Sequence, residues 1–457
     1  MLNRRTFVQT LVAASLTGLE GSLARANPQA GFGELQRDPA RIIDLPKGFS
    51  YTVIARTGEE MNDGLLLPGH PDGMAAFPAD NGLLHLVINH EVDAFDAHVG
   101  PWGKHNQRLS RIAHDRVYDR GRERSPGCGG TSTLVYNPVT REVEYKVLSL
   151  AGTEYNCAGS ATPWNSWLSC EESPSMPGRS ISGFTAVHFE KPHGYVFEVP
   201  SAALEAIEPV PLRAMGRFEH ECALVDPRTG IVYQTEDKDR GLFYRFIPNV
   251  PGKLHQGGKL QALAVIGHDR FDTRNWHGRP AVRPGDWLEV RWLDLEDIDS
   301  PDNDLRLRGF AAGAARFARG EGIAYWDDSL TFACTDGGPA RRGQLFRYLP
   351  SRFEGSANEA AEPGRLQLFQ ESARDTPLRH ADNITAAPWG DLIVCEDSSW
   401  RSSLVGVRPN GDLYVLARNS YLDSELAGAC FSPDGKTLFL NIQYAGLTLA
   451  VTGPWPT

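Results

Sequence analysis

The sequence predicts an all-β protein, and more specifically a six-bladed β-propeller with long inserted loops on one face. The first observation is a pattern that recurs six times: a residue able to bind a metal, a turn, and a second such residue about fifteen positions later. The second is composition, because 46 glycines and 31 prolines are spread along the 457 residues, as many short strands joined by tight turns require. Such a period is typical of repeat architectures, so we expect one domain.

The two partners of each repeat are mostly acids, with one cysteine among them. Turn-forming residues lie midway between the partners, and strand-like runs such as residues 230–235 flank the turns. A hairpin folded at its midpoint brings its two ends together, so each repeat presents its partners side by side. Six radial hairpins would gather oxygen and sulfur donors around one axis. The pairs are Cys157 with Glu172, Glu221 with Glu236, Glu321 with Asp336, Asp382 with Asp397, and two looser copies, Asp72 with Glu91 and Glu425 with Asn441.

Further strand-like runs follow several of the hairpins. Residues 194–200, 241–248 and 343–350 share a leading glycine, aromatic residues and a closing proline, so we interpret them as equivalent strands of successive units. Four strands per unit and about six units describe a propeller whose inner strands line a central channel. Residues 95–130 and 249–316 interrupt the pattern, and we expect both segments to be loops inserted over one face.

The N-terminus has the form of a secretion signal. Paired arginines at positions 4 and 5 precede an apolar run, and residues 24–26 have the small-x-small form of a cleavage site. Paired arginines are typical of the twin-arginine export route. We therefore expect residues 1–26 to be a signal peptide read by the twin-arginine export machinery, and residues 27–457 to form a single catalytic propeller domain, periplasmic or secreted.

Charge and hydropathy exclude other classes of protein. The formal net charge of -11 argues against a nucleic-acid surface, because such surfaces are basic. No run after the signal reaches the roughly 18 apolar residues that cross a bilayer, so we expect no integral membrane segment in the mature chain. We also expect a monomer. Of the seven cysteines, Cys170, Cys334 and Cys395 end strand-like runs and should be buried, whereas Cys157 occupies a ligand position.

The expected donors suit hard cations. Carboxylates bind calcium, magnesium or ferric iron, whereas zinc sites normally hold more His or Cys. The single thiolate, Cys157, would bind calcium poorly and indicates a transition metal at one position. Arg319, two residues before Glu321, would place a guanidinium in the same cavity, where its planar fork suits phosphate. His90 and His220, each beside an acid, are expected to be structural or to support a ligand.

Several short stretches resemble the PhoX-type alkaline phosphatase family. They are residues 156–159, 162–164, 170–172, 216–218, 220–221, 235–237, 319–322, 335–338, 382–383, 396–397, 424–428, 431–435, 441–443 and 453–455. The resemblance runs from about residue 48 to the C-terminus. It implies a six-bladed propeller that holds two ferric ions bridged by oxide, together with calcium ions, and that hydrolyses phosphate monoesters.

The resemblance also implies roles for individual residues. Cys157 resembles the iron-bound thiolate and Arg319 the phosphate-binding arginine, and together with Glu221 and Glu321 they are the expected catalytic residues. The expected metal ligands are Cys157, Glu91, Glu171, Glu172, Glu221, Glu236, Glu321, Asp336, Asp382, Glu396, Asp397 and Glu425.

The predicted function is an exported metallophosphatase with Fe(III) and Ca²⁺ as cofactors and phosphate esters as substrates. A metal-bound oxide or hydroxide is expected to attack phosphorus in line while Arg319 clamps the equatorial oxygens. Two alternatives stay open. One is a calcium-dependent propeller hydrolase of another kind, a lactonase or a phytase, and the other is a non-catalytic calcium propeller that binds a partner through its loops.

Overall fold

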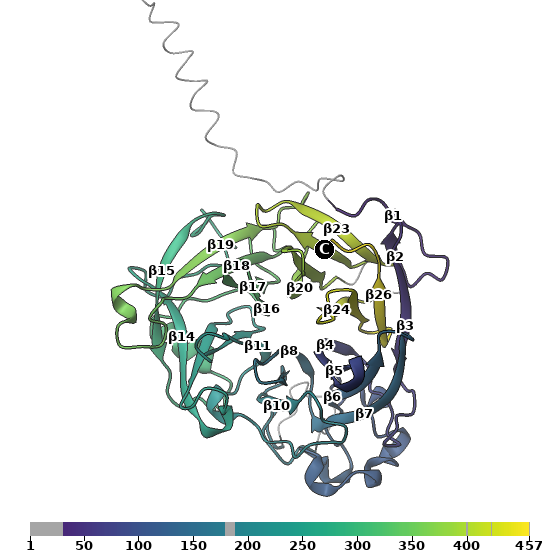
Figure 1. Ribbon diagram of the computed structural model, residues 1–457. Coiled ribbons are helices and arrows are strands. Elements are labelled where there is room, and N and C mark those ends of the chain that lie inside the picture. Colours follow the sequence, from purple (N-terminus) through teal and green to yellow (C-terminus); the bar gives the residue numbers. More distant parts are fainter. Residues whose placement is uncertain (1–30, 179–187, 399–400, 422, 457) are drawn as a thin grey trace, which may run out of the picture.

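The computed structural model describes residues 31–178, 188–398, 401–421 and 423–456, which form a ring of antiparallel sheets around a central axis (Figure 1). Of the described residues, only Leu305–Ala311 form an α-helix, α2, so the all-β prediction is confirmed. No helix within these ranges is long and apolar enough to span a bilayer. The signal peptide predicted for residues 1–26 lies outside the described residues.

Hydrogen bonds join the strands into five sheets. Two sheets are built from consecutive strands only. One contains β4 (Pro71–Pro78), β5 (Leu84–His90), β6 (Gly129–Asn137) and β7 (Glu142–Thr153), and the other contains β8 (Asn156–Ala161), β9 (Ser166–Glu171) and β10 (Val196–Pro200). The largest sheet holds β11 (His220–Val225), β12 (Val232–Glu236), β13 (Phe243–Pro248), β14 (Gly258–Val265), β15 (Trp287–Asp294), β16 (Gly320–Trp326), β17 (Ser329–Cys334), β18 (Gln344–Leu349) and β19 (Arg365–Glu371).

Strands from both ends of the chain complete the last two sheets. One contains β1 (Leu35–Gln36), β2 (Ile43–Pro46), β20 (Ala381–Ala386), β21 (Leu392–Glu396), β22 (Ser403–Val407) and β23 (Leu413–Asn419). The other contains β24 (Leu426–Phe431), β25 (Thr437–Ile442), β26 (Leu447–Thr452) and β3 (Ser50–Arg56). Because β2 pairs with β23 and β3 pairs with β26, the start of the described chain is hydrogen-bonded to its end, which closes the ring.

The hydrogen bonds therefore define five sheets, whereas the sequence predicted six blades. The difference lies in the nine-stranded sheet, which consists of two successive four-stranded meanders, β11 to β14 and β16 to β19. They are joined because β15 pairs with β14 along one edge and with β19 along the other. The innermost strands β4, β8, β11, β16, β20 and β24 contact one another in a closed cycle around the axis (Figure 1).

All six predicted hairpins are present, and each predicted turn lies between the first two strands of a meander. The runs expected to be equivalent later strands form β10, β13 and β18. Residues 95–130 are largely a loop with short 3-10 turns between residues 97 and 123, as predicted. The prediction for residues 249–316 was wrong, because this segment contributes the complete strands β14 and β15 and the helix α2.

Apolar side chains pack between neighbouring sheets, and they are fully buried. Leu345 of β18, for example, belongs to the same apolar cluster as Val394 of β21 and Val405 of β22. All seven cysteines lie in the described residues, are unpaired and are buried, which confirms the expectation for Cys170, Cys334 and Cys395.

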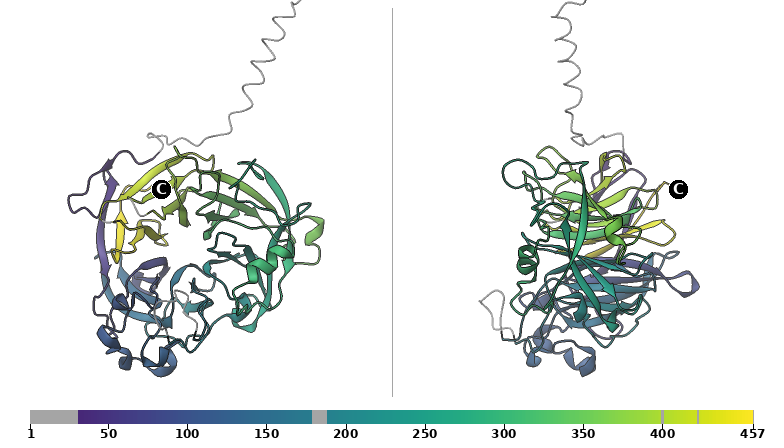
Figure 2. Two further views of the ribbon diagram at one scale, coloured as in Figure 1. Left: turned by 180° about the vertical axis from the view of Figure 1, so that it is seen from behind. Right: turned by 90° about the vertical axis from the view of Figure 1, so that its left-hand side faces the viewer.

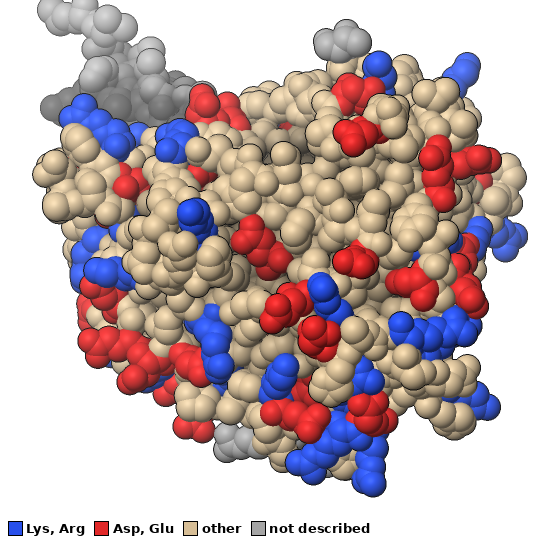
Figure 3. All heavy atoms as spheres, turned by 60° about the horizontal axis from the view of Figure 1, so that its bottom comes forward, with Lys and Arg blue, Asp and Glu red and all other residues tan. Residues whose placement is uncertain are grey.

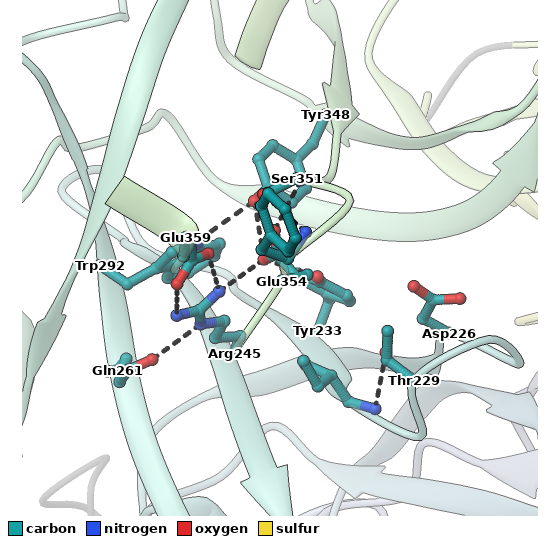
Figure 4. Close-up of polar contacts among 12 residues, drawn as sticks. Asp226, Thr229, Tyr233, Arg245, Gln261, Trp292, Tyr348, Ser351, Glu354 and Glu359 are labelled. Carbon is teal, nitrogen blue, oxygen red and sulfur yellow. Dashed lines mark hydrogen bonds and ion pairs between the residues drawn. The ribbon is translucent and has the colours of Figure 1, made fainter. Parts of the chain in front are cut away.

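A buried ionic network joins the two meanders of the largest sheet (Figure 4). Arg245 of β13 donates from Nη1 to Glu354 at 2.5 Å and from Nη2 to Glu359 at 2.7 Å, and both acids belong to the connection between β18 and β19. The hydroxyls of Tyr233 and Tyr348 also donate to Glu354, at 2.9 and 2.7 Å. A buried charge is tolerated only when it is paired and hydrogen-bonded, so this network fixes the two meanders relative to each other.

The outer surface is mixed in charge. On the face that Figure 3 shows, lysine and arginine side chains lie interspersed with aspartate and glutamate rather than gathered in one patch. Figure 2 shows the ring from behind and from the side.

Candidate functional site

A β-bulge at the same position interrupts each of the six innermost strands. The ladder register shifts after Pro71, Asn156, His220, Gly320, Ala381 and Ala427, and it resumes three residues later in every case. Bulges of this kind re-aim a side chain and are frequent beside active sites. In five of the strands the residue that follows the last paired position is a possible metal ligand, namely Asp72, Cys157, Glu221, Glu321 and Asp382.

The residue directly after the second strand of each hairpin also has an equivalent role in all six hairpins. There the backbone N–H donates to the carbonyl of a residue just before the bulge, at 2.9 to 3.3 Å. These hydrogen bonds hold the open end of each hairpin closed, so the two positions lie side by side near the axis. The six bonds are Glu91 to His70, Glu172 to Tyr155, Asp237 to Glu219, Thr335 to Arg319, Asp397 to His380 and Gln443 to Glu425.

Seven of these side chains form three groups in which one ligand atom from each residue lies within 4.8 Å of the others. The groups are Asp72 with Glu91 and Cys157, Cys157 with Glu172 and Glu221, and Glu221 with Glu321 and Asp382. Cys157 belongs to the first two groups and Glu221 to the last two. The three groups therefore form one continuous cluster, contributed by β4, β8, β11, β16 and β20 and by the residues that follow β5 and β9.

Burial makes the cluster electrostatically unfavourable without cations. Burial, followed by the charges of Glu321 and Asp382, raises the pKa of Glu221 well above its ordinary value. Burial, followed by Asp72 and Glu221, raises the pKa of the Cys157 thiol in the same way. Neither carboxylate oxygen of Glu221, nor Oδ1 of Asp72, has a hydrogen-bond partner in the described part of the chain. Buried oxygens aimed at one another without donors, together with a thiol, fit a set of metal ions that would supply the missing positive charge.

Arg319 places a guanidinium beside this cluster. Its Nε and Nη2 donate to Oδ1 and Oδ2 of Asp237 at 2.8 and 2.7 Å, a bidentate pair. Nη2 lies 3.3 Å from Glu321 and Nη1 lies 3.5 Å from Asp397. Burial alone would lower the pKa of Arg319, but Glu321, Asp237 and Asp397 raise it, so the side chain stays charged. Its backbone φ of 53° is unusual for a residue other than glycine and indicates a conformation that the surrounding structure imposes.

Three predicted ligands lie outside the cluster. Glu171, Glu236 and Glu396 are the last residues of β9, β12 and β21, and each accepts a hydrogen bond from the backbone near the start of the following strand. Glu171 accepts from Gly194 at 2.8 Å, Glu236 from Leu242 at 3.1 Å and Glu396 from Ser403 at 3.0 Å. Successive side chains of a strand point to opposite sides, so the acid before the axial position faces the sheet instead.

Three other predicted ligands surround the cluster without belonging to the three groups. Asp397 and Asp336 are partly exposed near Arg319, and Oδ1 of Asp336 lies 3.5 Å from Nδ1 of His380. Burial and the charges of Asp382 and Glu91 raise the pKa of Glu425, which indicates that its carboxylate faces the same acids. Asn441, the expected partner of Glu425, instead donates to the backbone carbonyl of Asp72 at 2.6 Å.

The prediction missed three residues that share the site. Asp237 occupies the position that had been assigned to Glu236, and Gln443 occupies the one assigned to Asn441. Gln443 donates to Oδ2 of Asp72 at 2.7 Å and also to Glu91. Thr335, rather than Asp336, holds the equivalent position after β17. The available signal was the pair of adjacent acids, as in Glu236-Asp237, because only one of two neighbours can face the axis.

The two histidines next to acids point away from the cluster. His90 contacts the carbonyl of Gly69 at 3.0 Å and the hydroxyl of Ser132 at 2.8 Å, and burial lowers its pKa to about 4. His220 stacks on Phe218 with ring centroids 3.6 Å apart. Both histidines therefore have structural contacts, in agreement with the prediction.

Small residues line a narrow cavity on the axis beside the cluster. The bulges contribute Gly73, Ala158, Gly322 and Gly428 to a cavity of only about 40 Å³. A Cβ on Gly428, whose φ is 60°, would lie 2.0 Å from the carbonyl oxygen of Asp72. Glycine is required there because the inner strands approach so closely.

The fold and this site define a class: a β-propeller-like protein with a cluster of potential metal ligands on its axis and one arginine beside it. The sequence matches the family described as alkaline phosphatase PhoX over residues 30–136 and 131–446. The chain belongs to this family and is therefore a phosphatase. None of the curated proteins matches it.

Several solved structures are similar to this chain, and the first of them supports the fold. The structure of Pseudomonas fluorescens PhoX in complex with vanadate, a transition state analogue, is similar with a TM-score of 0.64 and 19% identity, and the match covers 94% of this chain and 98% of that one. A gluconolactonase from Xanthomonas campestris has a TM-score of 0.42 and 11% identity over 90% of this chain and 97% of its own. Virginiamycin B lyase from Staphylococcus aureus has a TM-score of 0.41 and 10% identity over 88% and 99%.

Proposed function

We propose that this phosphatase is an exported metalloenzyme that hydrolyses phosphate monoesters at the axial cluster. The observation that carries the proposal is the continuous set of three ligand groups, linked through Cys157 and Glu221, with the guanidinium of Arg319 beside it. No protein nucleophile would be needed for this chemistry, because metal ions held by these residues would activate a water and would neutralise the charge on phosphoryl oxygens.

We infer that Fe(III) and Ca²⁺ are the metals. The thiolate of Cys157 favours a transition metal, and the groups on either side of it are rich in carboxylate oxygen, which suits hard cations. Glu91, Glu172, Glu221, Glu321 and Asp382 would complete the ligand set together with Asp72. Ionised carboxylates are then matched by cation charge, which explains how so many buried acids are tolerated.

Arg319 would hold the phosphoryl group. A guanidinium binds two oxygens of a tetrahedral anion with its planar fork, and the bidentate pair with Asp237 fixes the plane of that fork. In this arrangement Nη1, which lies farther from its nearest acid than Nη2 does, is the group most available to an incoming phosphate. Asp237 is thus a positioning residue.

We also infer a six-bladed organisation for residues 27–457, in which the nine-stranded sheet counts as two blades, and a monomeric, periplasmic or secreted enzyme after removal of residues 1–26. The six bulged inner strands and their six equivalent hydrogen bonds support six blades. Export by the twin-arginine route can be tested by replacing Arg4 and Arg5 with lysine, which should leave the protein in the cytoplasm.

The direct test is metal analysis of the exported protein together with an assay on nitrophenyl phosphate, with and without a chelator. We expect iron and calcium to co-purify and activity to disappear on chelation. Full activity in metal-free protein would refute the proposal. Cys157→Ala should remove iron and most of the activity, so a variant with unchanged iron content and rate would exclude that role for Cys157.

A further inference from the structure

Tyr444 is an exposed aromatic side chain beside an otherwise buried, acidic site. It lies in the turn between β25 and β26 with 62% of its surface exposed, although it directly follows Gln443, which contacts Asp72 and Glu91. Its backbone N–H donates to the hydroxyl of Ser424 at 2.9 Å, and the turn is closed by a bond from Gly446 to Gln443 at 2.9 Å. The backbone of the turn is therefore held in place, which fixes the position from which the Tyr444 side chain extends.

A second ring contacts it from the neighbouring sheet. The ring of His70 lies 4.8 Å from that of Tyr444 at an interplanar angle of 64°. Nδ1 of His70 contacts the carbonyl of Glu91 at 3.2 Å, and its backbone φ of 45° again indicates an imposed conformation. His70 directly precedes β4, which packs beside β24 in Figure 1.

Tyr444 and Arg319 lie at the equivalent ends of two hairpins of the ring. Tyr444 directly follows Gln443, whose backbone N–H closes one hairpin on the carbonyl of Glu425, and the carbonyl of Arg319 accepts the equivalent hydrogen bond from Thr335. Asp397 lies 3.5 Å from Nη1 of Arg319. Asp397 closes the hairpin of β20 and β21, and β20 lies between β16 and β24 in the ring, so Arg319 and the aromatic pair flank the same end of the cluster.

We propose that Tyr444 and His70 form the leaving-group subsite of this phosphatase and favour phosphate monoesters of aromatic alcohols. This inference rests on the proposed function. In an aryl ester the ring is attached directly to the bridging oxygen, so the ring would lie beside the phosphoryl group, within reach of neighbouring aromatic side chains. A neighbouring tyrosine contributes offset or edge-to-face contacts with such a ring, which an aliphatic alcohol cannot make to the same extent.

The test compares phenyl phosphate with glycerol 2-phosphate in wild type, Tyr444→Ala and Tyr444→Phe. Aromatic pairs contribute about 0.5–1.5 kcal/mol, so Tyr444→Ala should lower kcat/KM for phenyl phosphate about two- to twelve-fold and change kcat/KM for glycerol 2-phosphate less than about two-fold. Tyr444→Phe should keep the preference. Comparing each variant with wild type on the same substrate removes the intrinsic difference between the two leaving groups.

Tyr145→Ala is the matched control, because Tyr145 is exposed but lies on β7, the outermost strand of its sheet. This variant should leave kcat/KM unchanged for both substrates. Equal losses on both substrates in Tyr444→Ala, or no loss on either, would overturn the inference while leaving the phosphatase proposal intact.

A binding measurement further separates the subsite inference from the proposed phosphatase function. Calorimetry with phenylphosphonate and methylphosphonate, which are not hydrolysed, should show tighter binding of the aryl compound in wild type and a loss of that difference in Tyr444→Ala. If wild type turns over neither ester, the phosphatase proposal fails, and the phosphonate affinities still decide whether the subsite exists. Equal affinity for both phosphonates in wild type would refute it.

Discussion

Replacing His193 with glutamine should destabilise the protein strongly and in a pH-dependent way. His193 is fully buried between two acids: Nδ1 contacts Oε1 of Glu171 at 2.7 Å, and Nε2 lies 3.5 Å from Oδ2 of Asp119. Glu171 ends β9 and Asp119 belongs to the long loop of residues 95–130, so the histidine links a sheet to that loop. Removing it leaves two buried acids without their positive partner.

The magnitude follows from the pKa of the imidazole. Burial alone would lower that pKa, but Glu171 and Asp119 raise it from 6.5 to about 10. This difference corresponds to about 5 kcal/mol at 1.36 kcal/mol per pKa unit, close to the cost of breaking a buried ion pair. Because the folded pKa is raised, the stabilisation is complete below about pH 6.5 and is lost as the pH rises to about 10.

Urea unfolding followed by tryptophan fluorescence measures the effect. The difference in unfolding free energy between wild type and His193→Gln should be about 5 kcal/mol at pH 6 and should shrink by about 1.4 kcal/mol per pH unit above pH 6.5. His98→Gln is the control, because His98 is 75% exposed beside Asp96 and should cost little at any pH. A difference that stays constant from pH 6 to pH 10 would show that His193 is neutral and refute the reasoning.

Three further outcomes are expected. Cys157→Ser should abolish any visible thiolate-to-metal absorption and reduce bound iron, whereas Cys128→Ala, at a buried cysteine outside the three ligand groups, should retain both; metal-binding spectra of the two variants decide this. Arg319→Lys should lower kcat about 10²- to 10³-fold because the bidentate fork is lost, and Arg228→Lys, in an exposed turn, should not; a kcat within two-fold of wild type would contradict the role of Arg319. Burial raises the pKa of Asp72 from 3.8 to about 7 in the metal-free chain. The folded state therefore holds this proton more tightly than the unfolded state, so the free energy of unfolding falls as the pH rises from 3.8 to about 7. Chelated protein should therefore unfold at a lower temperature at pH 8 than at pH 5.5, and calorimetry showing the reverse order would contradict this.

Local sequence patterns predicted much of the fold. Turn residues such as Asp226-Pro227 and Pro433-Asp434-Gly435 are informative because their preference for turns is a property of a few adjacent residues, and all six predicted hairpins are present. The strand β15 was missed because Trp287 to Asp294 is largely exposed and lacks a clean alternation of buried and exposed positions. Its place between β14 and β19 depends on pairing with residues far away in the sequence.

The amino-acid sequence by itself determined that acids recur at the ends of the hairpins and that Cys157 and Arg319 lie among them. Tertiary structure decided which of them meet. In Glu171-Glu172, Glu236-Asp237 and Glu396-Asp397 both neighbours carry a carboxylate, but a strand turns successive side chains to opposite sides, so one binds the backbone and the other faces the axis. The bulge in each inner strand re-aims the first ligand of the hairpin, and it forms only where the partner strand and the neighbouring sheets hold the backbone in register.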